Sequence, residues 1–108
     1  MKNIQTVQTS LKVEDIQYWG SGDFQLPPNE IYTLVIDYPF DCERRYQIKT
    51  GKGMGLAGVF KHIGKAYEKT YADANKGNNG YWHGIEDLHL EEIKVNHKKK
   101  LITLSVGS

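Results

Sequence analysis

Apolar and polar residues alternate over residues 4–13, where Val7, Leu11 and Val13 share one parity and polar residues lie between them. A period of two predicts a half-buried β-strand. Gly, Ser, Asp and paired Pro residues then interrupt the pattern over 14–30, which predicts a long irregular loop. The loop carries three large apolar residues: Trp19, Phe24 and Leu26. They either attach the loop to the core or form an apolar rim for a partner.

Two further strands are predicted to form an antiparallel hairpin. Residues 31–38 (IYTLVIDY) have apolar side chains at both parities, as in a strand covered on two sides. Residues 44–50 (RRYQIKT) alternate, which directs Tyr46 and Ile48 inward and the intervening polar side chains outward. The segment PFDCE between the two strands supplies the turn.

Residues 55–73 change to helical spacing. Apolar side chains recur at steps of three and four and form one stripe: Leu56, Val59, Phe60, Ile63, Tyr67 and Tyr71. This stripe predicts an amphipathic helix packed on a sheet. Lys61, Lys65 and Lys69 form a second stripe, the lysine stripe, which we expect to face solvent. The helix is expected to end in DANKGNNG, because Asn and Gly tolerate left-handed backbone conformations.

The last third of the chain predicts a second hairpin, with strands IEDLHLEEIKV and KLITLSV joined by NHKK. Leu88 and Leu90 share one parity, whereas Ile93 and Val95 share the other. A β-bulge at 91–92 would direct all four side chains inward, because a bulge adds one residue to one strand of a pair.

Together these elements predict one α+β domain that spans residues 1–108. The predicted order is β-β-β-α-β-β, with a mostly antiparallel sheet and one long helix packed on one face. One helix covers only one face of a sheet, whereas 31–38 has apolar groups on both. We therefore expect a homo-oligomer, in which a second copy covers the other face.

Charge and composition exclude several classes of partner. The 108 residues include 14 Lys and Arg against 13 Asp and Glu, so no strong overall field attracts nucleic acid or anionic lipid. The N-terminus has no signal-peptide pattern, and no apolar run reaches the roughly 18 residues of a membrane helix. We expect a soluble cytoplasmic protein with no membrane partner. Because Cys42 is the single cysteine, an intrachain disulfide and a cysteine-based zinc site are excluded.

The glycine loop, residues 51–58, contains GMGLAG and so matches the pattern Gly-x-Gly-x-x-Gly. Asp73 follows at about the 20-residue spacing of a dinucleotide-binding fingerprint. However, the preceding strand RRYQIKT is too polar for a buried parallel strand, and Asp73 lies at a helix end. A phosphate-binding Walker loop also requires Ser or Thr after Gly51-Lys52, where this chain has glycine. The context therefore argues against both nucleotide-binding folds.

A simpler anion site is predicted at the same place. Unpaired amide groups at a helix start bind anions, and cations of the preceding strand and loop lie nearby in the sequence. An aromatic segment, residues 81–83, is available to cover a base or a ring. The predicted ligand-binding residues are Arg44, Arg45, Lys49, Gly51, Lys52, Gly53, Gly55, Tyr81, Trp82 and His83. Alternatively, the glycines only permit a tight reversal, and Trp82 only covers the end of the core.

Metal and catalytic chemistry have little support in the sequence. The four histidines, His62, His83, His89 and His97, lack the spacing of a zinc site on one strand or one helix. We expect no metal, no cofactor and no catalytic set. The acidic residues Glu86, Asp87, Glu91 and Glu92 are explained as a charged strand edge, and HKKK is explained as a solvated turn.

These features predict a non-enzymatic binding module, a homo-oligomer, that binds a small anionic or nucleotide-like ligand at the glycine loop and the helix start. The alternative is a protein-interaction adaptor or inhibitor that binds a protein partner through the loops 19–26 and 81–83. An enzyme is the third hypothesis, and it would pair His83 with an acidic neighbour in one cleft.

Overall fold

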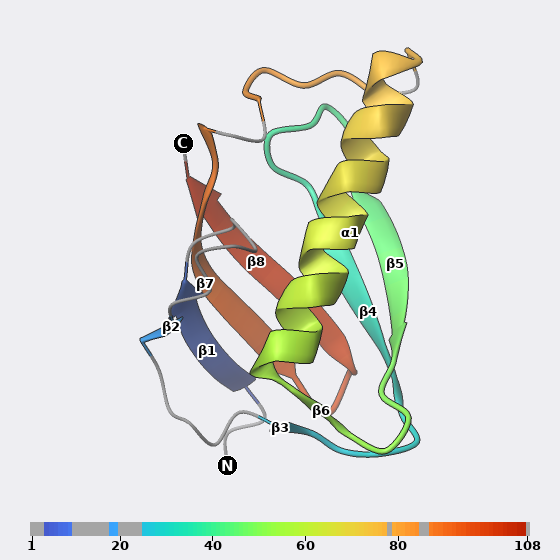
Figure 1. Cartoon of the computed structure of the whole chain (residues 1–108), viewed down its shortest axis with the longest axis vertical. Coiled ribbons are helices and arrows are strands. Elements are labelled where there is room, and N and C mark those ends of the chain that lie inside the picture. Colours follow the sequence, from blue (N-terminus) through green and yellow to red (C-terminus); the bar gives the residue numbers. More distant parts are fainter. Residues whose placement is uncertain (1–3, 10–17, 20–24, 78, 85–86, 108) are drawn as a thin grey trace.

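The computed structural model of the chain describes residues 4–9, 18–19, 25–77, 79–84 and 87–107, with side chains from residue 25 onward. One helix, α1 (Leu56–Asn75), crosses one face of a sheet (Figure 1). The strands are β1 (Ile4–Thr9), β2 (Tyr18–Trp19), β3 (Gln25–Leu26), β4 (Ile31–Ile36), β5 (Arg44–Lys49), β6 (Met54–Gly55), β7 (His89–Asn96) and β8 (Leu101–Gly107).

The main sheet has six strands in the order β2-β1-β7-β8-β4-β5. Adjacent strands of this sheet pair antiparallel, except for β4 and β8, which pair parallel. The predicted α+β architecture, with a mostly antiparallel sheet and one long helix on one face, is therefore confirmed. The short strands β3 and β6 form a separate two-stranded ladder where the chain enters α1.

The predicted loop 14–30 is more regular than expected at both described places. Tyr18–Trp19 pairs with the end of β1, and Gln25–Leu26 pairs with Met54–Gly55. Leu26 is fully buried, so this residue attaches the segment to the core. This agrees with the first of the two sequence interpretations, attachment of the loop to the core. Phe24 and the end of the first predicted strand, residues 10–13, lie outside the described residues.

The helix buries the stripe that its sequence predicts. All six apolar residues of that stripe are buried, together with Ala66 and Thr70, whereas the three residues of the lysine stripe are exposed. Opposite the helix, Tyr32, Leu34 and Ile36 of β4 are fully buried. The core therefore lies between α1 and the sheet, because the alternation of β4 directs these side chains toward the helix.

The predicted bulge in β7 is present. Pairing with β8 shifts between Leu90, which pairs with Val106, and Glu92, which pairs with Ser105, so residue 91 is left without a paired residue in the ladder. As a result Leu88, Leu90, Ile93 and Val95 are all buried, with at most 2% of any of them exposed.

The face of the sheet away from α1 is polar over β5 and mixed over β4. Alternation places Ile31 and Val35 on this face, where Ile31 is 48% exposed and Val35 only 8%. A second copy covering this face stays a prediction. Among the described residues, no helix has the length and apolar character needed to cross a membrane.

Candidate functional site

The fold separates the residues that were predicted to bind one ligand. The glycine loop lies at the start of α1, whereas the aromatic segment lies beside its C-terminal end (Figure 1). A helix of 20 residues is about 30 Å long, so these two places are too far apart for one small ligand. Arg44 also lies near the end of α1, because it contacts Asp73.

The glycine loop makes a tight turn whose backbone groups bond within the protein. Gly51 and Gly53 have positive φ angles of 58° and 110°, a conformation that side chains other than glycine rarely adopt. The amide of Gly53 donates to Thr50 O at 2.9 Å, and Gly51 O accepts from Asn29 N at 2.8 Å. The observed geometry therefore fits a structural role for these two glycines. Gly55 precedes α1 in an extended conformation, without a side-chain cap.

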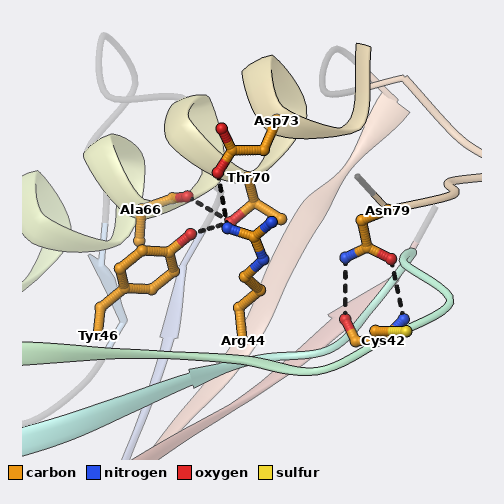
Figure 2. A network of polar contacts seen from close by, with 7 residues as sticks. All are labelled: Cys42, Arg44, Tyr46, Ala66, Thr70, Asp73 and Asn79. Atoms are coloured by element: carbon orange, nitrogen blue, oxygen red, sulfur yellow. Dashed lines mark hydrogen bonds and ion pairs between the residues drawn. The ribbon is translucent and has the colours of Figure 1, made fainter. Parts of the chain in front are cut away.

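The four predicted cations do not converge. The guanidinium of Arg44 donates to the carboxylate of Asp73 at 2.6 Å, and this hydrogen bond raises the pKa of the guanidinium further (Figure 2). Arg45 lies on the opposite face of β5 and pairs with Glu43 at 2.7 Å. Lys49 and Lys52 are exposed near the glycine loop. Of the four predicted cations, Lys49 and Lys52 therefore accompany the start of α1, and Arg44 and Arg45 do not.

The aromatic segment forms part of a ring cluster beside the C-terminal turns of α1. The ring of Tyr81 contacts that of Tyr71 edge-on at 4.9 Å between centroids, and the ring of Trp82 contacts that of Tyr38 at 5.9 Å. Tyr81 is nevertheless 42% exposed and Trp82 is 54% exposed. Trp82 thus packs by one edge and leaves about half of its surface to solvent.

Instead, the fold assembles a cationic cleft between α1 and the edge strand β5. The cleft has a volume of about 150 Å³, and its lining residues are Tyr46, Gln47, His62, Lys65, Ala66 and Lys69. Two members of the lysine stripe therefore lie beside β5, and none of the six lining residues is acidic. The cleft forms because the lysine stripe flanks the apolar stripe that packs on the sheet.

A polar contact joins β5 to α1 beside the cleft. Tyr46 belongs to the inward parity of β5, and its hydroxyl is 2.7 Å from Oγ1 of the fully buried Thr70. Thr70 donates in turn to Ala66 O at 2.7 Å, so the hydroxyl of Tyr46 acts as the donor in the first contact (Figure 2). The side chain of Tyr46 therefore bridges β5 and α1, and Tyr46 is one of the residues that line the cleft.

Replacing Tyr46 by Phe tests this contact. Because a net hydrogen bond contributes about 1 kcal/mol, we expect Tyr46→Phe to lower the free energy of unfolding by about that amount in urea titrations. Tyr81→Phe is the matched control, since the bond from Tyr81 Oη to Asn75 Oδ1 is exposed, and its effect should be smaller. Equal effects of the two substitutions would show that the Tyr46 contact has no special role.

The charge of the cleft depends on pH through His62. Burial lowers the pKa of its imidazole below the usual value, and the ammonium groups of Lys65 and Lys61 lower that pKa further. Near neutral pH in the free protein, the imidazole of His62 is therefore protonated to a smaller extent than that of an unperturbed histidine. An anion in the cleft would favour the protonated imidazolium, so binding an anion would take up a proton.

The other histidines show no metal site. The described residues contain no group of three or more His, Cys, Asp or Glu side chains that could hold a metal ion. His97 Nδ1 lies 2.8 Å from the hydroxyl of Tyr32, and the ring of His83 lies 6.2 Å from that of Tyr38. Glu86, one member of the predicted acidic cluster, lies outside the described residues.

Comparison with known proteins adds no family to this description, because no family model, curated protein or solved structure matches the chain.

The sequence analysis did not identify the cationic cleft, although one signal for it was present. Arg44 shares its parity with Tyr46 and Ile48, which point toward the core. A guanidinium on the inward side of a strand needs a partner on the facing helix, and such a partner fixes which flank of that helix lies beside the strand.

Proposed function

We propose that the chain is a binding module, and that it binds an anionic group in the cationic cleft between α1 and β5. The observation that carries this proposal is the convergence of Lys65 and Lys69 with His62 on one cavity that has no acidic lining residue. The remaining lining residues, Tyr46, Gln47 and Ala66, carry no charge.

The size of the cleft favours a small anionic group over a whole nucleotide. A volume of about 150 Å³ compares with about 30 Å³ per water molecule in the liquid, so the cleft has room for a carboxylate, sulfate or phosphate group. Pockets that enclose drug-sized ligands usually measure about 300–1,000 Å³. The ligand class is therefore a compact anion or the anionic group of a larger molecule.

Inorganic sulfate is a suitable probe because its charge does not change near neutral pH. We expect sulfate, titrated at constant ionic strength, to shift the amide NMR signals of residues 46–47 and 62–69. The double variant Lys65→Glu/Lys69→Glu should weaken this binding by about tenfold or more, since each lost cation contributes about 1 kcal/mol and each new charge repels the anion.

The matched control is Lys49→Glu/Lys52→Glu, which changes the net charge equally but alters the cations near the glycine loop. This control should retain the sulfate affinity of the unchanged protein within about twofold. Binding that depends instead on Lys49 and Lys52 would place the anion at the glycine loop and would refute the cleft as the site.

The pH dependence provides a separate check. Sulfate affinity should rise as the pH falls from about 8 to about 5.5, because the bound anion stabilises the protonated form of His62. His62→Gln should remove most of this dependence while leaving weak binding to Lys65 and Lys69. A pH profile that is the same in both proteins would exclude His62 from the site.

A second candidate function is protein interaction through the aromatic segment, favoured by the exposure of Tyr81 and Trp82 on one surface. Large aromatic side chains in such positions often dominate protein interfaces. If this is the function, Trp82→Ala should abolish binding of a stoichiometric protein partner in native extract, and Lys65→Glu/Lys69→Glu should not. If the lysine variant lost the protein partner and Trp82→Ala kept it, the aromatic segment would be excluded as the binding surface.

A further inference from the structure

We propose that the anionic group in the cleft belongs to an acidic segment of another protein, and that this segment adds as an extended strand to the free edge of β5. The inference rests on the proposed function, because the cleft must accept an anionic group. It goes further by specifying the chemical class of the partner and its mode of binding.

The sheet order supplies the first step. β5 is the last strand of the six-stranded sheet, so one of its edges pairs with β4 and the other is open in the part of the chain that the structure describes (Figure 1). The open edge lies beside α1, and two residues of β5, Tyr46 and Gln47, also line the cationic cleft. The cleft and the open edge are therefore parts of one surface.

The hydrogen-bond pattern supplies the second step. Thr50 N donates to Glu30 O at 2.9 Å, which makes these two residues a hydrogen-bonded pair. Thr33, the partner of Gln47, instead donates its amide to Lys100 O, on the side of β8. Hydrogen-bonded and non-hydrogen-bonded pairs alternate along an antiparallel ladder. The residues that direct their backbone N–H and C=O groups to the open edge are therefore Arg45, Gln47 and Lys49.

Charge supplies the third step. A strand added beside β5, about 4.8 Å away, would direct alternate side chains toward α1, where they would meet Lys65 and Lys69 of the cleft. Its other side chains would lie on the face that carries the side chains of Arg45 and Lys49. Both faces of the added strand would therefore meet cations. Glu and Asp are the side chains that complement this environment.

The same charges disfavour a second copy of this chain on the open edge. An antiparallel pair of β5 strands centred on Gln47 would place Arg45 of one copy opposite Lys49 of the other. Directly opposed like charges destabilise a strand pair. Lysine and arginine at edge strands commonly prevent such self-pairing. The edge thus rejects its own copy while it attracts an acidic segment.

A seven-residue peptide that alternates Thr and Glu, with blocked ends, tests the proposal. Its binding can be followed by NMR and by amide hydrogen exchange. We expect slower exchange at the amides of Arg45, Gln47 and Lys49 in the complex, since these donors become hydrogen-bonded. The peptide should bind at least about tenfold more tightly than one in which Gln replaces Glu, which corresponds to about 1.4 kcal/mol.

Two matched controls separate strand addition from simple charge attraction. The first is the same acidic peptide with N-methylated amides on the side that faces β5, which keeps every charge but removes the backbone donors. The second is the variant Gln47→Pro, which removes an outward amide while leaving the bonds between β5 and β4 intact. Each control should weaken peptide binding by about tenfold or more.

The outcomes distinguish the two proposals. If the peptide and its N-methylated form bind equally well, strand addition is refuted while the anionic cleft stands. Equal binding of the Glu and Gln peptides refutes the acidic class of partner. If neither sulfate nor the peptide binds, the proposed function itself fails. Exchange protection at β5 without any peptide, together with a dimer in solution, would show that a second copy occupies the edge and would also refute the inference.

Discussion

A chain that lacks Lys94 is expected to lose much of its stability, whereas a chain that lacks Glu91 is expected to keep the fold. Both residues are exposed charged residues of β7, so exposure and charge do not distinguish them. They differ in their positions relative to the bulge. Removing Glu91, which has no paired residue in the ladder with β8, brings Leu90 and Ile93 to the same parity in a regular strand.

Removing Lys94 has the opposite effect, because Ile93 and Val95 then become neighbours of opposite parity. One of these buried residues must leave the core, and if the bulge is lost, Glu92 points inward instead. Losing one large aliphatic side chain from a core costs about 2–5 kcal/mol, a large share of the roughly 5–15 kcal/mol that stabilises a domain.

Urea unfolding followed by circular dichroism measures both effects. The deletion of Glu91 should change the free energy of unfolding by about 1 kcal/mol or less, because no buried side chain changes face. Glu91→Ala serves as the control for loss of the side chain alone. A deletion of Glu91 that unfolds the protein would mean that the bulge does more than correct the parity of β7.

The bulge in β7 illustrates why much of the fold could be predicted from the sequence. Parity in a strand and the 3.6-residue period of a helix are local properties, so the bulge and the buried stripe of α1 follow from neighbouring residues. Strand order is not local. Nothing in the alternation of residues 31–38 or 100–106 identifies β4 and β8 as parallel neighbours, because alternation specifies a face and not an adjacent strand.

The fold does not bring the predicted ligand-binding residues together, for a related reason. Arg44 and Arg45 are adjacent in sequence, but successive residues of a strand point to opposite faces, so they cannot act as one cluster. Arg44 finds Asp73, 29 positions later, at the far end of the helix. The cationic cleft likewise joins residues 46–47 to residues 62–69, a contact that depends on how α1 packs across the sheet. Sequence spacing alone does not determine that packing.

The end of the molecule that carries the aromatic segment depends on a different long-range contact, made by Asn79. Its amide oxygen accepts from Cys42 N at 3.0 Å, and its amide nitrogen donates to Cys42 O at 3.1 Å (Figure 2). The neighbouring Gly80 O accepts from Asp41 N, and Trp82 N donates to Pro39 O. Asn79 thus begins a short ladder that attaches the segment after α1 to the β4–β5 connection.

Replacing Asn79 by Ala is expected to lower the free energy of unfolding by about 2 kcal/mol, because a buried side chain loses two hydrogen bonds and both backbone groups of Cys42 lose their partner. Local exchange should rise more than global stability falls, so the amides of Asp41 and Trp82 should exchange faster than those of β4. Urea titration and amide exchange measure these two effects.

Asn75→Ala is the matched control, since it removes an amide that receives only the exposed bond from Tyr81, and its effect should stay within about 0.5 kcal/mol. Asn79→Asp distinguishes the two hydrogen bonds between the side chain of Asn79 and the backbone of Cys42. A carboxylate accepts from Cys42 N but cannot donate to Cys42 O, so at neutral pH this variant should recover only part of the loss. If Asn79→Asp had the full stability of the unchanged protein, or if Asn79→Ala lost none, the ladder between residues 79–82 and 39–42 would not depend on the amide side chain of Asn79.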